Sequence, residues 1–175
     1  MNVRSAAASD AGSMAEVVVG SWRWAYRGLL SDEFLESLDP SVRAERLRST
    51  MEDPTSRAQV WVAEVEGRIV GTASAGPPLD TYDEPDTPPP PHSGELYMIY
   101  VEPGSIGTGV GRALLQASTE ALRTQGFSSA FLWVLEGNER ARLFYEKAGW
   151  TWDGSRSSHM IDCLNMPVVR YVTFL

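Results

Sequence analysis

The fold is decided by one stretch, which reads ELYMIYV (95–101), EPGSIGTGVGR (102–112) and ALLQASTEALR (113–123). Its first part is rich in β-branched and aromatic residues and predicts a strand that ends before Pro103. Its last part has apolar residues at helical spacing and predicts an amphipathic helix. Three glycines, Gly107, Gly109 and Gly111, lie between the two. The stretch therefore predicts a strand that enters a helix through a tight loop.

The start of such a helix favours an anion, because its first amides are unpaired and the helix dipole is positive there. Glycine also lets the backbone approach a ligand closely. The spacing excludes two nucleotide motifs. A dinucleotide fingerprint needs a glycine where Arg112 stands, and a Walker loop needs Gly-Lys-Ser/Thr where Gly109 is followed by Val110 and Gly111. Another phosphate-bearing ligand and an ordinary strand-to-helix turn both remain open.

The composition predicts one compact domain over residues 1–175, because the chain is 43% hydrophobic and has an ordinary domain length. No apolar run approaches membrane-spanning length, so we expect a cytoplasmic protein without a membrane partner. The single cysteine, Cys163, excludes an internal disulfide, and the isolated His92 and His159 give no metal-ligand spacing. The formal charge of −8 and the pI near 4.8 argue against nucleic acid and suit a cationic acceptor.

The N-terminal half predicts a strand at 2–7 and then a helix that Ser9 or Asp10 can cap. Aromatic residues gather at the end of this helix, where Trp22 and Tyr26 predict either core packing or the wall of an acceptor pocket. Polar helical segments are expected at 32–38 and 41–51. Strand-type runs at 59–65 and 68–75, joined by a glycine-containing turn, predict a hairpin.

The segment 76–94 has seven prolines, several carboxylates and no Lys or Arg. Proline at this density neither pairs in a sheet nor continues a helix, so the segment is expected to be an exposed loop insertion. It is open whether this loop simply connects two strands or forms an acidic lid that attracts a cationic substrate.

The C-terminal half predicts a helix that stops at Gly126, a buried strand at 129–135, and a helix at 139–148 that Asn138 can cap. A final strand is expected at 168–175, with an extra strand near Met160. The whole order is that of a mixed α/β domain.

Two motifs resemble those of the GNAT N-acetyltransferase superfamily. The first is the pyrophosphate loop, Gln/Arg-x-x-Gly-x-Gly/Ala, which in the family follows a strand that ends in a hydrophobic residue, any residue and Pro. Here Val101-Glu102-Pro103 matches the strand end and Gly109-Val110-Gly111 matches the glycine core. Ile106 stands where the family has Arg or Gln. The second is LEGNERARLFYEKAGW (135–150), similar to Asn-x-x-Ala-x-x-Phe-Tyr-x-x-x-Gly-Phe. The resemblance covers nearly the whole chain. It implies the GNAT fold, a central, mostly antiparallel twisted sheet of six to seven strands flanked by helices.

The resemblance implies an acetyl-CoA-dependent N-acetyltransferase that needs no metal. The cosubstrate would be held by the strand end, the glycine loop and Asn138, which are the residues Ile99, Tyr100, Val101, Gly107, Thr108, Gly109, Val110, Gly111, Arg112 and Asn138. For Asn138 a helix cap is the alternative role, because one side chain does not easily serve both purposes.

The family motif places the general acid at Tyr145, which would protonate the leaving thiolate. This transfer is uphill by only about two units, because a thiol has a pKa of about 8.5 and a phenol about 10. The first candidate for the general base is Glu95, at the start of the central strand, with Glu136 and Glu102 as alternatives. Trp22 and Tyr26 are the candidate acceptor-binding residues.

The expected reaction is direct transfer to a primary amine of a small molecule, peptide or protein, because Cys163 lies outside both motifs and suggests no covalent acyl-enzyme. The alternative is a non-catalytic GNAT-fold module that binds acyl-CoA as a sensor. The sequence leaves the acceptor, the identity of the base and the effect of Ile106 open. It also leaves open whether the protein is a monomer or a homodimer.

Overall fold

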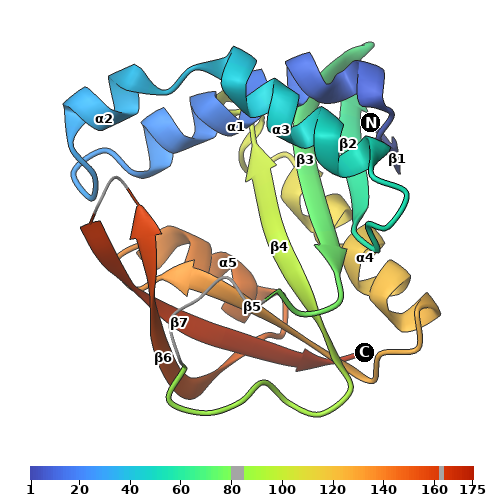
Figure 1. Ribbon diagram of the computed structural model, residues 1–175, viewed down its shortest axis with the longest axis vertical. Coiled ribbons are helices and arrows are strands. Elements are labelled where there is room, and N and C mark those ends of the chain that lie inside the picture. The colour runs from blue at the N-terminus through green and yellow to red at the C-terminus, as the bar shows by residue number, and fades with distance from the viewer. Residues whose placement is uncertain (80–84, 162–163) are drawn as a thin grey trace. The chain divides into compact units, whose positions relative to one another are not determined.

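The computed structural model of the chain describes residues 1–79, 85–161 and 164–175. Seven strands are hydrogen-bonded in the order β1-β2-β3-β4-β5-β7-β6 (Figure 1). The strands are β1 (Asn2–Ser5), β2 (Gln59–Val65), β3 (Arg68–Gly76), β4 (Ser93–Val101), β5 (Ser129–Leu135), β6 (Thr151–Ile161) and β7 (Leu164–Phe174). The helices are α1 (Ala11–Ala25), α2 (Asp32–Ser37), α3 (Pro40–Glu52), α4 (Val110–Thr124) and α5 (Glu139–Lys147).

The expected fold class is confirmed. β4 and β5 run parallel, whereas the pairs β1–β2, β2–β3, β5–β7 and β6–β7 are antiparallel. The sheet is therefore mixed and mostly antiparallel, and the order of elements along the chain is the expected one. The extra strand expected near Met160 is β6, which pairs along the final strand.

The chain forms two compact units. Unit 1 comprises Met1–Ala75 and Met98–Ser118, and unit 2 comprises Gly76–Tyr97 and Thr119–Leu175. The division falls within β4 and within α4, so each unit holds part of both elements. The prediction of one domain over residues 1–175 stays a prediction.

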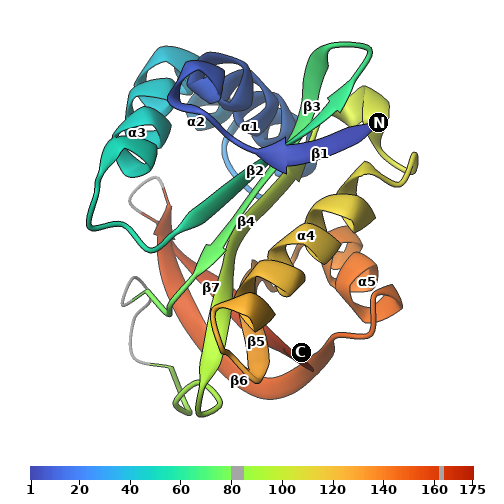
Figure 2. The same ribbon diagram turned by 90° about the vertical axis from the view of Figure 1, so that its right-hand side faces the viewer.

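In unit 1, α1 and α3 pack on one face of the first strands (Figure 2). The core between them comprises Ala11, Met14, Ala15, Ala44, Leu47 and Val62. Pro40 is the first residue of α3, where its missing N–H costs nothing, and the Asp39 carboxylate accepts a hydrogen bond from the Ser41 amide at 2.7 Å. This local chemistry explains why the two predicted helical segments separate at that proline.

On the other face of these strands, α4 lies against β3 (Figure 2). A Cβ atom on Gly71 would come within 2.8 Å of side-chain atoms of Leu114 and Val110. Only glycine allows such a close approach, because methyl carbons pack at about 3.5–4.0 Å. Gly71 therefore determines how near the first turns of α4 lie to the sheet.

In unit 2, β5 is almost wholly buried and α5 packs against β7 through aromatic side chains. Gly126, with φ of 91°, follows α4 and ends it as expected. Its amide donates to the Arg123 carbonyl at 3.0 Å, and the Phe127 amide donates to the Leu122 carbonyl at 3.2 Å. Cys163 lies outside the described residues.

The strands extend further into the predicted loop than the sequence indicates. β3 continues to Gly76 and β4 begins at Ser93, so Gly94 lies within a strand and is buried. The physical reason is packing, because a Cβ on Gly94 would come within 2.6 Å of a Leu122 methyl group. Three of the carboxylates on which the acidic-lid hypothesis depends, Asp80, Asp83 and Glu84, lie outside the described residues.

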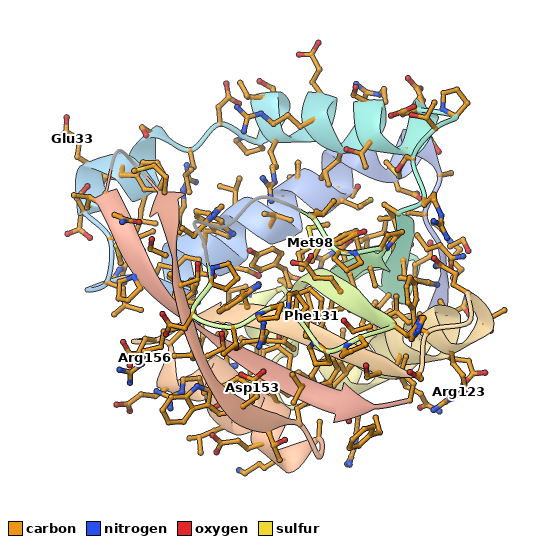
Figure 3. All side chains as sticks on the ribbon, turned by 60° about the horizontal axis from the view of Figure 1, so that its bottom comes forward. Glu33, Met98, Arg123, Phe131, Asp153 and Arg156 are labelled. Atoms are coloured by element: carbon orange, nitrogen blue, oxygen red, sulfur yellow. The ribbon has the colours of Figure 1, made fainter. Side chains whose placement is uncertain are left out.

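Within unit 2, a buried arginine binds both β6 and the described end of the proline-rich segment. Arg170, only 2% exposed, donates from Nε to Asp153 at 2.7 Å and from Nη1 to the Thr87 carbonyl at 2.9 Å. Asp153 lies on β6 (Figure 3). Among the described residues, no helix is long and apolar enough to cross a membrane.

Candidate functional site

The glycine loop of unit 1 has the backbone that an anion-binding turn requires. A single 3₁₀ turn, Pro103–Ser105, follows β4, and Gly107 and Gly109 then adopt φ of 82° and 94°. The α-helical hydrogen bonds begin with the Ala113 amide, which donates to the Gly109 carbonyl at 3.0 Å. The amides of the first three residues of α4, Val110 to Arg112, therefore precede this ladder, as expected at a helix N-terminus.

The loop also has room for a ligand. A Cβ on Gly107 or Gly109 would meet nothing within 4 Å, and both residues are exposed, as is Arg112. Exposed amides beside a guanidinium suit the charge of a diphosphate. Thr108 differs from its neighbours, because its amide and its hydroxyl both donate to the Ser105 carbonyl, at 3.4 and 2.6 Å. Its side chain therefore shapes the loop.

The end of β4 in unit 1 is tied to α1. The Ser21 hydroxyl donates to the Val101 carbonyl at 2.7 Å, and the Glu102 amide donates to the Val70 carbonyl at 2.8 Å. Both contacts fix the position of the strand end that leads into the glycine loop. Ile99 and Tyr100, which the sequence also predicts at the cosubstrate site, are half-buried in the same strand.

Four rings of unit 1 form an aromatic cluster, which we define as Trp22, Tyr26, Phe34 and Tyr100. The Trp22 ring meets Tyr26 edge-on at 5.0 Å between centroids, and it lies 6.5 Å from Phe34 and 6.4 Å from Tyr100. The sequence identified Trp22 and Tyr26 as acceptor-binding candidates. It gave no signal that Phe34 and Tyr100 join them, because these two residues lie on separate elements, and it predicted Tyr100 only at the cosubstrate site.

Arg23 joins α1, which carries Trp22, to α2, which carries Phe34. Its guanidinium donates to the carbonyls of Leu35 and Leu38 at 3.0 and 2.9 Å, so it caps the end of α2 from α1. α2 starts with the Ser31 hydroxyl accepting from the Phe34 amide at 3.2 Å. Both ends of this short helix are thus fixed by side chains, which orders the segment that carries Phe34.

In unit 2, Glu95 is buried, with 1% of its surface exposed. Its carboxylate accepts a hydrogen bond from the Leu79 amide at 2.7 Å. Two residues along β4, the Tyr97 hydroxyl donates to the Pro77 carbonyl at 2.5 Å. Glu95 is therefore a buried, hydrogen-bonded carboxylate and not a solvated one at a strand end. Glu95 is the third residue of β4, and the start of the proline-rich segment binds to it.

Each of the other two candidate bases forms an ion pair. Glu136 lies 2.9 Å from Arg156, and Glu102 lies 3.1 Å from Arg68. Figure 3 labels Arg156 on β6. Both pairs are partly exposed, so each alternative base already shares a carboxylate oxygen with an arginine near the protein surface. Glu95 stays the first candidate.

Asn138 caps α5, which is one of the two roles predicted for it. Its Oδ1 accepts a hydrogen bond from the Ala141 amide at 3.1 Å. A cap uses only the oxygen of the side-chain amide, and the Nδ2 group is a separate donor. Capping and a contact with the cosubstrate therefore use different atoms.

Tyr145 is 7% exposed and lies among other rings. Its ring centroid is 5.2 Å from Phe144, 6.1 Å from Trp150 and 6.3 Å from Tyr171. Tyr171 donates to Glu146 at 2.6 Å, and burial raises the pKa of its hydroxyl, while a hydrogen bond from Arg142 opposes that rise. The neighbours of Tyr145 thus hold its ring in a fixed place.

Metal chemistry has no evident ligand set in the described part of the chain. No group of three or more His, Cys, Asp or Glu side chains there is arranged to hold a metal ion.

Comparisons with known proteins show which family the chain belongs to. Residues 21–150 match the model of the Acetyltransferase (GNAT) family. The "Uncharacterized N-acetyltransferase YuaI" of Bacillus subtilis is 35% identical over 147 residues, which cover 83% of this chain and 78% of the relative. The "Uncharacterized N-acetyltransferase Mb2688" of Mycobacterium bovis is 29% identical over 150 residues, covering 85% and 88% of the two chains. The chain therefore belongs to the GNAT acetyltransferase family and is an N-acetyltransferase, whose acceptor is an amine.

Solved structures support the same fold. The PaiA N-acetyltransferase of Thermoplasma acidophilum, solved in complex with coenzyme A, superposes with a TM-score of 0.73 at 19% identity. The alignment covers 99% of this chain and 98% of that one. At this identity the likeness shows the fold, and the GNAT fold expected from the sequence is confirmed.

Proposed function

We propose that this enzyme transfers the acetyl group of acetyl-CoA directly to a primary amine of a small molecule, peptide or protein. The observation that carries the proposal is the loop from Gly107 to Arg112. Two glycines with positive φ open onto free space at the start of α4, with one exposed guanidinium beside them. This arrangement suits the diphosphate of a coenzyme.

The donor is bound mainly by backbone groups in this proposal. The amides of Gly107 and of the first turn of α4 hold the diphosphate, together with Arg112. Ile106, where the family has Arg or Gln, contributes no charge, so Arg112 carries more of the side-chain interaction. The backbone of Ile99 to Val101 holds the extended pantetheine arm in the manner of an added strand.

Glu95 is the proposed general base. The amine must lose a proton to attack, because an alkylammonium ion has a pKa of about 10. Glu95 is buried, so a water molecule relays the proton to it in this proposal. The amine nitrogen forms a bond to the acetyl carbonyl carbon, and the carbon–sulfur bond breaks.

Tyr145 is the proposed general acid, and its hydroxyl gives a proton to the departing thiolate. The proposal rests on the place of Tyr145 in the Phe-Tyr motif. The rings of Phe144, Trp150 and Tyr171 support it, since a catalytic side chain must be held in position. Asn138 would contact the cosubstrate through Nδ2 while its oxygen caps α5.

The acceptor is proposed to meet the aromatic cluster of unit 1, where Trp22 and Tyr26 lie. The cytoplasmic location expected from the sequence stays a prediction, as do the monomeric and homodimeric alternatives.

The test is a thiol-release assay with acetyl-CoA and a panel of primary amines. Release above the rate of hydrolysis for at least one amine supports the proposal. Binding of acetyl-CoA without release on any amine would contradict it and would point to the sensor alternative.

A further inference from the structure

The aromatic cluster contains one buried polar atom without a hydrogen-bond partner. The indole N–H of Trp22 is closed to solvent and makes no hydrogen bond. The rings around it belong to Tyr26, Phe34 and Tyr100. Buried polar groups in proteins are nearly always paired, and leaving one unpaired costs about 1–3 kcal/mol. This N–H therefore needs a physical explanation.

Other buried polar atoms without partners in the described residues have simpler explanations. A serine hydroxyl rotates and also accepts, a glutamine amide has two ends, and an arginine has further N–H groups. These atoms belong to Arg43, Ser93, Gln125 and Ser155. Tryptophan has a single donor on a rigid ring, so no rotation of a hydrogen or exchange of atoms satisfies it.

We infer that the acceptor is an amine that also carries a neutral carbonyl oxygen and an apolar body, and that Trp22 recognises this oxygen through its indole N–H. The inference rests on the proposed function and names the substrate class. The Trp22 ring is half-buried, so a bound molecule can contact the ring, and its oxygen reaches the closed N–H once a neighbouring side chain of the cluster turns aside. The surrounding rings supply apolar and aromatic contact, and the N–H supplies one directed hydrogen bond.

A neutral oxygen suits this place better than a carboxylate. The neighbours of the N–H are aromatic rings, and an ionised group placed among them loses its hydration. Arg23, the nearest cation along α1, is engaged with the carbonyls of α2. Amino-acid amides and peptide N-termini with apolar side chains have the required chemistry, whereas simple alkylamines lack the oxygen.

The backbone elements around the cluster are held in place, so only side chains have to move when a ligand binds. α2 is fixed at its start by Ser31 and at its end by Arg23, and the Ser21 hydroxyl ties α1 to β4 one residue beyond Tyr100. Preorganisation of this kind lowers the cost of binding, because less side-chain freedom is lost. Trp22 thus acts as a specificity-determining residue.

The test compares L-phenylalaninamide with 2-phenylethylamine, which lacks the carbonyl. In Trp22→Phe we expect kcat/KM to fall about tenfold for the amide and less than twofold for the simple amine. The tenfold fall corresponds to the loss of about one hydrogen bond. Because the variant and the wild-type enzyme are compared with the same amine, the different basicities of the two amines do not affect the comparison. Phe34→Leu is the matched control within the cluster and should affect both amines alike. Trp24→Phe is a second control, because it removes an indole from the exposed side of α1 and not from the cluster.

A second readout does not need turnover or a stable variant. In wild-type protein labelled with ¹⁵N, the Trp22 indole cross-peak should move when L-phenylalaninamide is added with coenzyme A, and stay in place with 2-phenylethylamine. Equal losses for both amines in Trp22→Phe, with an unmoved cross-peak, would overturn the inference. So would a tenfold loss of coenzyme A affinity, which would make Trp22 a donor-site residue. Absence of thiol release with every amine defeats the proposed function instead, and the cross-peak then still tests the inference.

Discussion

The carboxylate of Glu95 on β4 accepts a hydrogen bond from the backbone N–H of Leu79, at 2.7 Å. The proposed general base is therefore also the anchor for the start of the proline-rich segment. A second anchor lies two residues further on, where Tyr97 donates to the Pro77 carbonyl. The base and the segment that follows β3 are thus linked through one carboxylate.

Glu95→Gln separates these two roles, because glutamine keeps an oxygen for the Leu79 amide but cannot take a proton. We expect kcat to fall about 100-fold, the usual contribution of a general base, with the acetyl-CoA dissociation constant within about twofold of wild type. Steady-state kinetics and isothermal titration calorimetry measure the two quantities. Wild-type kcat in this variant would assign Glu95 to anchoring alone.

Tyr145→Phe removes the proposed acid but keeps the ring between Trp150 and Tyr171. We expect kcat to fall about 100-fold while acetyl-CoA affinity stays nearly intact. Tyr171→Phe is the control, since it removes a buried hydroxyl from the same group of rings. It should lower stability by about 1–2 kcal/mol and leave kcat within a few-fold. Equal losses of turnover and affinity in Tyr145→Phe would make Tyr145 a binding or packing residue.

Arg112→Ala tests the consequence of Ile106. With no Arg or Gln at position 106, Arg112 is the charged side chain proposed for the diphosphate, and its loss should weaken acetyl-CoA binding about tenfold. The effect should shrink at high salt, because the guanidinium is exposed. Arg123→Ala, at the far end of α4 and pointing into solvent, is the matched control (Figure 3). An unchanged dissociation constant for Arg112→Ala would show that the amides alone suffice.

Asp10 gives unit 1 an acid-sensitive contact. Its carboxylate accepts hydrogen bonds from Arg4 at 2.7 and 3.0 Å, and this interaction lowers the pKa of Asp10 below its ordinary value of 3.8. Since the unfolded state then binds the proton more readily, the stabilisation is present above pH 3.8 and is lost as the pH falls through the folded pKa.

Asp10→Asn should therefore destabilise the protein by about 1 kcal/mol at pH 7, after allowance for solvent around the half-exposed Arg4. Thermal unfolding from pH 7 to pH 3 should show a shallower loss of stability than in wild type. Glu16→Gln, an exposed carboxylate on the same helix, should keep the wild-type profile. An identical acid slope in Asp10→Asn and wild type would exclude the contact as its source.

The local features of the fold were predictable because their causes lie close together in the sequence. The hairpin of β2 and β3 follows from two strand-type runs and a turn in which Glu66 and Gly67 both have positive φ. The Asn138 cap likewise needs only its own helix. The glycine loop is a third case, since its conformation depends on residues within one turn of each other.

Features that depend on distant partners were not predictable. Ser9 or Asp10 was expected to cap α1; Asp10 is the N-cap residue, but its carboxylate binds Arg4 and the Ala7 amide rather than the first helical amides. Glu95 is buried because the segment at Leu79 returns to it, and no periodic pattern records such a contact. Phe34 and Tyr100 join the aromatic cluster from separate elements for the same reason.

The most direct test of the central claim measures two products in one reaction: free thiol from acetyl-CoA and the acetylated amine. The account predicts that wild-type protein forms them in equal amounts with at least one primary amine, and that both fall together in Tyr145→Phe. Saturable acetyl-CoA binding with neither product, across amines that include amino-acid amides and peptides, would contradict it.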